Sequence, residues 1–415
     1  MNLAVTGALL DGQAVGLRSE DGLIADLGPS VEPSAGDEVI DAEGLLLSPP
    51  MVNGHTHAAM TLFRGFGDDM PLMEWLRTKI WPAEAKLHPD DVYWGTRLAC
   101  LEMIRSGTSR FFDMYWHGGE AARAVVDSGL RAAISTVMID QLDPATGESM
   151  RAEVLESVDR IAESGPRVSP SLGPHAIYTV SSESLAWLAE VAADREISLQ
   201  IHLSETEEEV RDCIEAHGKR PAAYLDELGF LGPGTVLAHG VWLDEDELEL
   251  IAAREATVVA NPAANMKLAV GGVLPYQAAA RAGVRLGLGT DGVSSNSNLD
   301  SFEEVKLFAL SQKHASRDSS TLPADEALAI ARGLRSPALG GTPLQVGEPA
   351  DFLLLRASDP ELSAGDLDAD LVYAAGGSVV DTTVVAGRVL MRDRVAPGAD
   401  ELVAEVRARA ARLTA

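Results

Sequence analysis

The sequence predicts an α/β protein: a TIM-like (β/α)8 barrel with a small β-sandwich domain built from both chain ends. Short apolar strands alternate with amphipathic helices from about residue 45 to residue 336. Eight such βα units fit the size of a parallel barrel, roughly 250 residues or more. Both chain ends are strand-like, and neither has enough strands for a stable sheet of its own. We therefore expect the two ends to pair with each other.

The chain ends can be assigned element by element. The first part is rich in turns and strand-like at residues 3–10, 14–18, 22–28 and 38–44. Short strands are expected again at residues 350–356, 370–376 and 381–393. Residues 399–413 repeat apolar side chains every three or four positions, which predicts a helix. The expected domains are a composite β domain (1–49 plus 343–398), a barrel (50–342) and a C-terminal helix (399–415).

The expected barrel strands end at residues that can carry chemistry. These ends are His55/His57, Asp113, Asp140, His175, His202, His239, Asn261 and Asp291. Five of the nine histidines of the chain lie at these positions. Because the C-terminal strand ends of a barrel form one shared rim, catalytic residues gather there. The pattern predicts a functional site on that rim.

Composition excludes several classes of protein. The hydrophobic content of 46% excludes a disordered chain. A net charge of −30 disfavours binding to nucleic acid or to an anionic membrane. The two cysteines, Cys100 and Cys213, cannot form a disulfide framework, and the chain begins without a basic signal-peptide region. We expect a cytoplasmic protein, and both a monomer and a homo-oligomer remain open.

Four of the rim residues suit a metal ion. His55 and His57 are two apart on a strand, so both side chains can face one ion, although two polar loop residues would give the same pattern. His202 alone reads as a rim histidine and Asp291 alone as a turn residue. Together, three imidazoles and one carboxylate suit one divalent ion, with zinc as the first choice.

Two further residues suggest acid–base chemistry. Glu205 follows His202 by three residues, and a carboxyl group beside a metal can shuttle protons. The alternative is structural: Ser204 could cap a helix whose solvated first turn carries the acidic run. The catalytic and the structural interpretation are compatible if Glu205 points inward and residues 207–209 point outward. His239 is either a structural histidine or a group that polarises a water molecule.

Several segments resemble the amidohydrolase superfamily, and within it the 5-methylthioadenosine/S-adenosylhomocysteine deaminase group. They are residues 52–76, 80–87, 173–179, 201–206, 237–244, 261–268 and 287–292. The resemblance implies that His55, His57, His202 and Asp291 bind the metal. No lysine lies between residues 168 and 180, where related two-metal barrels have a bridging lysine, which favours a single ion.

The same resemblance assigns roles to other residues. Glu205 would protonate N1 of a purine ring, and His239 would assist the attacking water. Apart from the resemblance, Asp291 can take the proton of that water while it stays near the ion. The substrate-binding residues would be Glu84 at the ribose hydroxyls, His175 at the purine or its sugar, Trp75 in an aromatic wall, and Arg151 as one candidate for an amino-acid carboxylate.

The implied activity is hydrolytic deamination of an adenosine-type nucleoside to its inosine analogue and ammonia. The nucleoside could be adenosine, 5′-deoxyadenosine, methylthioadenosine or S-adenosylhomocysteine. The alternatives are a 6-aminodeoxyfutalosine deaminase and a guanine- or triazine-type amidohydrolase. A scaffold protein without catalysis is disfavoured, because every expected metal ligand is present.

Overall fold

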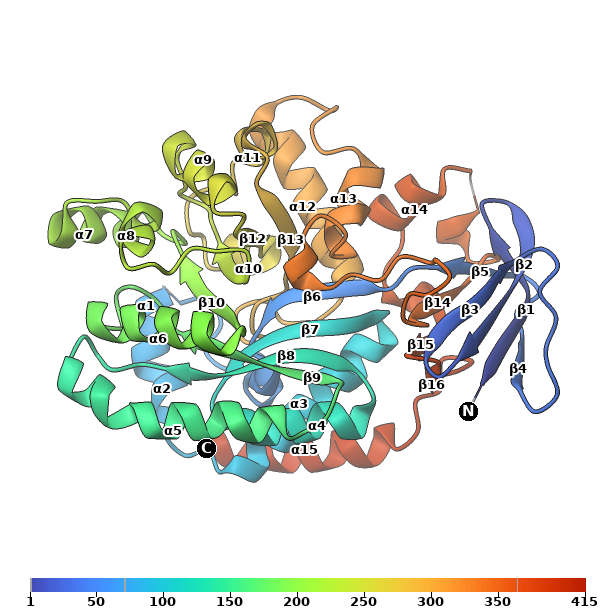
Figure 1. Cartoon of the computed structure of the whole chain (residues 1–415), viewed down its shortest axis with the longest axis horizontal. Coiled ribbons are helices and arrows are strands. Elements are labelled where there is room, and N and C mark those ends of the chain that lie inside the picture. The colour runs from blue at the N-terminus through green and yellow to red at the C-terminus, as the bar shows by residue number, and fades with distance from the viewer. Residues whose placement is uncertain (1, 71, 364) are drawn as a thin grey trace.

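The computed structural model describes residues 2–70, 72–363 and 365–415, and its centre is an eight-stranded parallel sheet curled into a barrel (Figure 1). The strand order is β13-β12-β11-β10-β9-β8-β7-β6. The strands are β6 (Met51–Thr56), β7 (Thr108–Tyr115), β8 (Arg131–Met138), β9 (Val168–Pro174), β10 (Ser198–Leu203), β11 (Thr235–His239), β12 (Thr257–Ala260) and β13 (Arg285–Leu288). The prediction of a (β/α)8 barrel is confirmed.

The barrel closes between its first and last strands. The backbone amides of Thr290 and Asp291 donate to the carbonyl oxygen of His55, at 3.1 and 3.0 Å. Apolar side chains fill the interior, among them Val52, Phe112 and Val259. Closure therefore places the residues that follow β13 beside the end of β6.

Helices surround the barrel and pack their apolar faces against it. They are α3 (Pro89–Arg105), α4 (Gly118–Ser128), α5 (Pro144–Ala162), α6 (Ser182–Arg195), α7 (Glu207–His217), α8 (Pro221–Glu227), α9 (Glu245–Ala253), α10 (Pro262–Lys267), α11 (Tyr276–Ala282), α12 (Ser301–Ser316), α13 (Ala324–Ala331) and η3 (Pro337–Leu339). The segment between β6 and α3 forms η1 (Ala58–Phe63), α1 (Leu72–Trp75), η2 (Leu76–Ile80) and α2 (Trp81–Glu84).

A second eight-stranded sheet combines both chain ends, as expected. Its order is β16-β15-β14-β5-β1-β2-β3, with β4 paired to β1. The strands are β1 (Leu3–Leu10), β2 (Gln13–Glu20), β3 (Leu23–Gly28), β4 (Glu38–Asp41), β5 (Leu45–Ser48), β14 (Phe352–Arg356), β15 (Val380–Val385) and β16 (Arg388–Met391). β5 and β14 pair antiparallel and join the two ends. The domain boundaries at residues 49, 342 and 398 stay a prediction.

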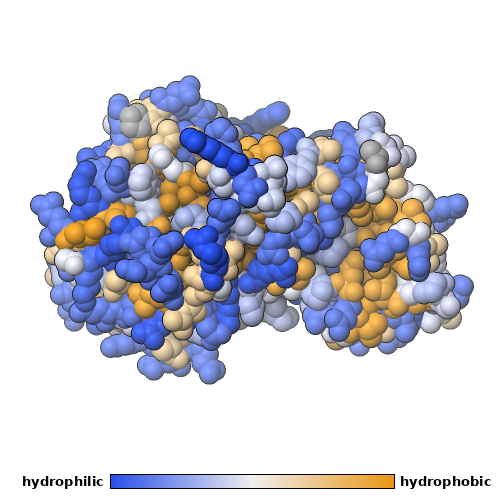
Figure 2. Space-filling view, turned by 90° about the horizontal axis from the view of Figure 1, so that it is seen from above, coloured by the Kyte–Doolittle hydropathy of each residue, from blue (hydrophilic) through white to orange (hydrophobic). Residues whose placement is uncertain are grey.

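The two parts are visible as a larger and a smaller lobe, and hydrophilic residues cover much of the larger one (Figure 2). The C-terminal helix α15 (Ala399–Leu413) was expected, and it lies along α3. There Arg409 and Arg412 both bind the buried carboxylate of Asp91. Within the described ranges, no helix has the length and apolar character needed to cross a membrane.

One expected strand is wrong. Residues 370–376 do not form a strand, because residues 367–373 form helix α14 (Leu367–Tyr373). The side chain of Asp366 accepts a hydrogen bond from the amide of Ala369 and caps this helix. Leu371 and Val372 are buried in the core. A short apolar run fits a strand as well as one or two helical turns, and here the cap at Asp366 favours the helix. The remaining short helices are η4 (Pro360–Leu362) and η5 (Gly377–Val379).

A buried ion pair joins the two sheets, and its removal tests the packing between them. Arg131 begins β8, Asp351 precedes β14, and their side chains are 15% and 0% exposed. Asp351→Ala should lower the free energy of unfolding by about 3–5 kcal/mol, because it leaves Arg131 without a counter-charge. Glu156→Ala breaks an exposed pair with Arg160 and should change stability very little. Equal losses in denaturant titrations of the two variants would contradict this prediction.

Candidate active site

Four residues predicted to bind a metal meet at the C-terminal end of the barrel. His57 Nε2 lies 3.2 Å from His202 Nε2 and 3.2 Å from Asp291 Oδ1. His55 Nε2 lies 3.7 Å from Asp291 Oδ1. Because β13 closes onto β6, Asp291 reaches both histidines of that strand. The structure therefore brings all four side chains to one centre.

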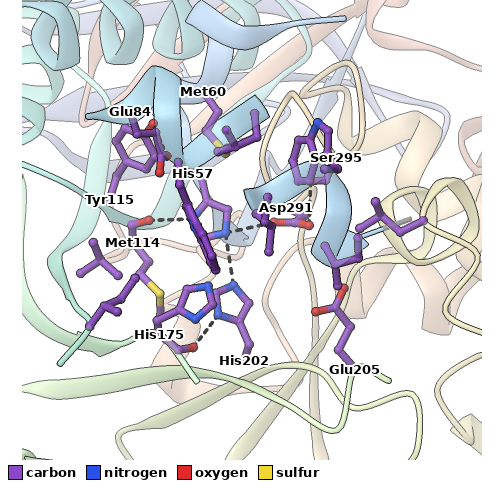
Figure 3. Close-up of a pocket in the computed structure, with 18 of the residues that line it drawn as sticks. His57, Met60, Glu84, Met114, Tyr115, His175, His202, Glu205, Asp291 and Ser295 are labelled. Carbon is purple, nitrogen blue, oxygen red and sulfur yellow. Dashed lines mark hydrogen bonds and ion pairs between the residues drawn. The ribbon is translucent and has the colours of Figure 1, made fainter. Parts of the chain in front are cut away.

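Backbone carbonyl groups fix two of the rings. His57 Nδ1 donates to the carbonyl oxygen of Met114, and His202 Nδ1 donates to that of His175, both at 2.6 Å (Figure 3). Since a carbonyl oxygen can only accept, each Nδ1 carries a proton. Each Nε2 is thereby turned toward the shared centre, which is how ligating histidines are commonly held.

His55 provides the clearest test of whether a metal fits. Its side chain is fully buried, and neither ring nitrogen has a hydrogen-bond partner among the described residues. Buried polar atoms without partners are costly, so this ring calls for a ligand. Three imidazoles and a carboxylate are a donor set that zinc accepts. The residues present therefore fit a divalent cation.

The charges in the cluster agree with this. Burial lowers the pKa of His55 and of His202 well below the usual value, which keeps both rings neutral. Burial also lowers the pKa of His57, but the hydrogen bond and charge of Asp291 outweigh it and raise that pKa to about 9. Burial raises the pKa of Asp291, yet His57 outweighs burial and the result lies well below the usual value. The centre thus favours a positive charge.

His239 also reaches this centre. One ligand atom each of His55, His202, His239 and Asp291 lies within 4.8 Å of the others. His239 Nδ1 donates to the side-chain oxygen of Asn265 at 2.8 Å, which leaves Nε2 on the other side of the ring. Sequence reasoning missed Asn265, although it lies in the matching segment 261–268 directly after β12.

Asp291 is held by residues of the following loop. Its Oδ1 accepts from the amide of Gly292 at 2.7 Å, and its Oδ2 accepts from Ser295 Oγ at 2.8 Å. The backbone of Asp291 has φ +59°, which L residues seldom adopt. Sequence reasoning did not identify Ser295, which lines the same pocket.

Glu205 points into the site, as expected, but the surrounding turn differs from the expectation. Thr206, not Ser204, caps α7, and its hydroxyl accepts from the amide of Glu209 at 3.2 Å. Glu209 was expected to point outward but is 4% exposed. Burial raises the pKa of Glu205, which favours its protonated form. Its Oε1 lies 3.9 Å from His239 Nδ1.

A cavity of about 80 Å³ opens beside the cluster. Its lining includes the predicted substrate-binding residues Trp75, Glu84, His175 and Glu205. In the view of Figure 3, Glu84 and Glu205 lie on opposite sides of the histidines. The cavity adjoins a larger one of about 1220 Å³, which shares Trp81, Glu84, Tyr178 and Glu205 with it.

Contacts within the protein orient the residues of this lining. Glu84 Oε1 accepts from the Tyr115 hydroxyl at 2.7 Å, and burial raises the pKa of Glu84. Trp75 Nε1 donates to the carbonyl oxygen of Phe66, and His175 Nδ1 lies 3.0 Å from Thr179 Oγ1. Sequence reasoning missed Tyr115, although it ends β7 in the way that the histidines end their strands.

The structure does not bring Arg151 to the site. This residue lies on α5, outside the barrel, with its guanidinium carbon 5.1 Å from the centre of the Trp187 ring on α6. Among the described residues, neither cavity counts Arg151 in its lining. The position of Arg151 therefore does not support a role for this residue in binding a substrate carboxylate.

Comparison with known proteins places the chain in a family. The sequence profile of the Amidohydrolase family matches residues 46–390. The chain belongs to the amidohydrolase family. Among its relatives, a 5′-deoxyadenosine deaminase of Methanoregula boonei is 48% identical over 90% of this chain and 86% of its own length. A 5-methylthioadenosine/S-adenosylhomocysteine deaminase of Thermococcus kodakarensis is 44% identical, over 86% and 85%.

Solved structures of other enzymes share the fold of this chain. An adenosine deaminase from Xanthomonas campestris with bound zinc superposes with a TM-score of 0.92 at 32% identity and covers 99% of this chain and 98% of its own. The zinc complex of an atrazine chlorohydrolase from Arthrobacter aurescens has a TM-score of 0.89 at 21% identity and covers 98% and 100%. At that identity the likeness concerns the fold alone.

Metal content tests the cluster directly. His55→Ala removes the histidine whose nitrogens lack partners, so the purified variant should contain far less than one metal ion per chain by elemental analysis. His217 stacks on Tyr224 away from the cluster, and His217→Ala should retain the full metal content. A His55→Ala variant with a full metal ion would remove His55 from the ligand set.

Proposed function

We propose that this amidohydrolase is a metal-dependent deaminase that converts an adenosine-type nucleoside to its inosine analogue and ammonia. The observation that carries the proposal is that one cavity is lined by two carboxyl groups. Buried Glu205 lies on one side of the histidine–aspartate cluster and Glu84 lies on the other. The carboxyl group of Glu205 is suited to a proton transfer, and that of Glu84 is suited to binding hydroxyl groups. Relatives at 43–48% identity are 5′-deoxyadenosine deaminases and a 5-methylthioadenosine/S-adenosylhomocysteine deaminase, which supports the same reaction class.

His55, His57, His202 and Asp291 would hold one divalent ion, and we propose zinc, which is bound in the related adenosine deaminase. When bound, such an ion lowers the pKa of a coordinated water from 15.7 to about 7 and so supplies a nucleophile at neutral pH. The buried, partnerless nitrogens of His55 support this assignment.

The protein side chains would manage the protons. Addition of water to C6 of the purine requires a proton on N1, and Glu205 would donate it, since burial favours its protonated form. Asp291 would accept the proton of the attacking water, and His239, fixed by Asn265, would orient that water. When the tetrahedral carbon collapses, Asp291 would pass that proton to the amino group, the C6–N bond would break and ammonia would leave, and the proton of the new C6 hydroxyl would return to Glu205. A nucleoside and water thus give an inosine-type product and ammonia.

The remaining pocket residues would bind the nucleoside. Glu84, oriented by the Tyr115 hydroxyl, can accept hydrogen bonds from the ribose hydroxyls. His175 and Trp75 would form walls for the purine and sugar. The larger adjoining cavity would leave room for a 5′ substituent. We further propose a cytoplasmic location, which the two buried free cysteines support.

Ammonia release from a panel of substrates tests the proposed activity. The metal-loaded protein should release ammonia from adenosine, 5′-deoxyadenosine, methylthioadenosine or S-adenosylhomocysteine and form the 6-oxo purine. The panel should also contain guanine, a triazine and 6-aminodeoxyfutalosine. Turnover of one of these three, without turnover of any adenosine-type nucleoside, would reject the proposal in favour of that activity.

Substitution of Glu205 tests the proton donor. Glu205→Gln keeps the shape of the side chain but cannot donate the proton, so kcat should fall by about 10²–10⁴-fold. Metal content should stay at the level of the unmodified protein, because Glu205 is not a proposed ligand. Full turnover by this variant would remove Glu205 from the mechanism.

The choice of substrate can distinguish ribose binding by Glu84 from a purely structural role of this residue. Glu84→Gln should raise KM for adenosine by roughly 10-fold or more, because the amide keeps one oxygen acceptor and presents an NH2 group in place of the other carboxyl oxygen. The nucleoside 2′,3′-dideoxyadenosine lacks both hydroxyls, so its KM should be the same for both proteins. An equal rise in KM for the two nucleosides would contradict ribose binding by Glu84.

A further inference from the structure

Glu209 is a buried carboxyl group for which the proposed reaction gives no role. It lies in the first turn of α7, where Glu207 and Glu208 are exposed but Glu209 is turned inward. Burial, with the nearby charges of Glu205 and Glu247, raises its pKa to about 8 against the lowering effect of two backbone hydrogen bonds. Burial of this group is unfavourable, so its position requires an explanation.

The explanation lies in what the two carboxyl oxygens bind. Oε1 accepts from the backbone amide of Ser204 at 2.8 Å, and Oε2 accepts from that of Glu205 at 2.9 Å. A residue at this place in a helix usually binds the amide of the capping residue, here Thr206. Glu209 reaches instead to the two amides before it, one of which belongs to Glu205 itself.

The turn that Glu209 holds is strained. Ser204 has φ +49°, in the left-handed region that side-chain-bearing residues rarely adopt, and its hydroxyl has no partner within the described residues. The carbonyl oxygens of Leu203 and Ser204 accept from the amides of Gly240 and Trp242, at 3.0 and 2.9 Å. The neighbouring strand end therefore holds the carbonyl side of the turn, and Glu209 holds its amide side.

We propose that Glu209 is a positioning residue, which fixes the backbone amides of Ser204 and Glu205 so that the Glu205 carboxyl group is aimed at the substrate ring. This inference rests on the proposed function, because it gives Glu209 a role only through Glu205. A displacement of a catalytic group by about 1 Å can cost on the order of 10²-fold in rate. Loss of Glu209 should therefore lower kcat without changing the metal content, because Glu209 is not a proposed ligand.

A double-mutant cycle tests this with the metal-loaded full chain. Glu209→Gln retains one acceptor but presents an amide group to a backbone N–H, so kcat should fall roughly 10- to 100-fold. In a Glu205→Gln background the same change should alter the residual rate by less than about twofold, because the residue that it positions no longer donates a proton. A general structural defect would instead lower both rates by the same factor.

Controls keep the outcome interpretable. Glu207→Gln removes an exposed charge from the same helical turn and should leave kcat unchanged. If Glu209→Gln does not melt cooperatively, Glu209→Asp, which is too short for both amides, replaces it in the cycle. Equal rate losses in the two backgrounds, or an unchanged kcat, overturn the proposal while the deaminase activity stands. Absence of ammonia release from every adenosine-type nucleoside overturns the proposed function and this inference with it.

Discussion

The convergence of three imidazoles and one carboxylate on a single buried point is the constraint on which the rest of the site depends. His57 and His202 are turned inward because backbone carbonyl groups hold their outer nitrogens. His55 has no partner among the described residues, and Asp291 favours a positive charge at the centre. A cation satisfies all four groups at once. The barrel provides the arrangement, because its closure sets Asp291 against the end of β6.

Backbone strain is concentrated at the same rim. Ser204 directly follows β10, His239 ends β11 and Asp291 lies three residues after β13. Their φ values are +49°, +78° and +59°. Such conformations persist only where the surroundings hold them, and they gather at functional sites. Here the contacts are identifiable. Glu209 accepts from the amide of Ser204, Asn265 accepts from the ring of His239, and Ser295 donates to the carboxylate of Asp291. A layer of polar residues behind the site thus determines where its reacting groups point.

The carboxyl groups of the pocket differ because their surroundings differ. Burial raises the pKa of Glu205 and of Glu84, whereas the pKa of Asp291 lies well below its usual value because His57 outweighs burial. One site can therefore contain a group that is ready to give a proton and another that is ionised and ready to accept one. This division of acid and base is typical of enzymes that perform both steps at neutral pH.

The sequence alone predicted the barrel and the rim residues, since apolar strands alternate with helical segments and His55, His202 and Asp291 stand where such strands end. It did not predict residues that act through tertiary contacts. Tyr115, Asn265 and Ser295 touch the site only because distant segments meet. Glu209 was expected to be solvated, because an acidic run at a helix start is usually exposed and no local pattern shows which member turns inward. Residues 370–376 were assigned to a strand because the apolar run was too short to show its period.

Anomalous X-ray diffraction at the zinc edge, from crystals of protein shown to be catalytically active, tests the metal centre most directly. We predict one strong peak per chain, bonded to the Nε2 atoms of His55, His57 and His202 and to the carboxylate of Asp291. An active protein with no metal at this position, or with its metal bound elsewhere, would contradict the central claim.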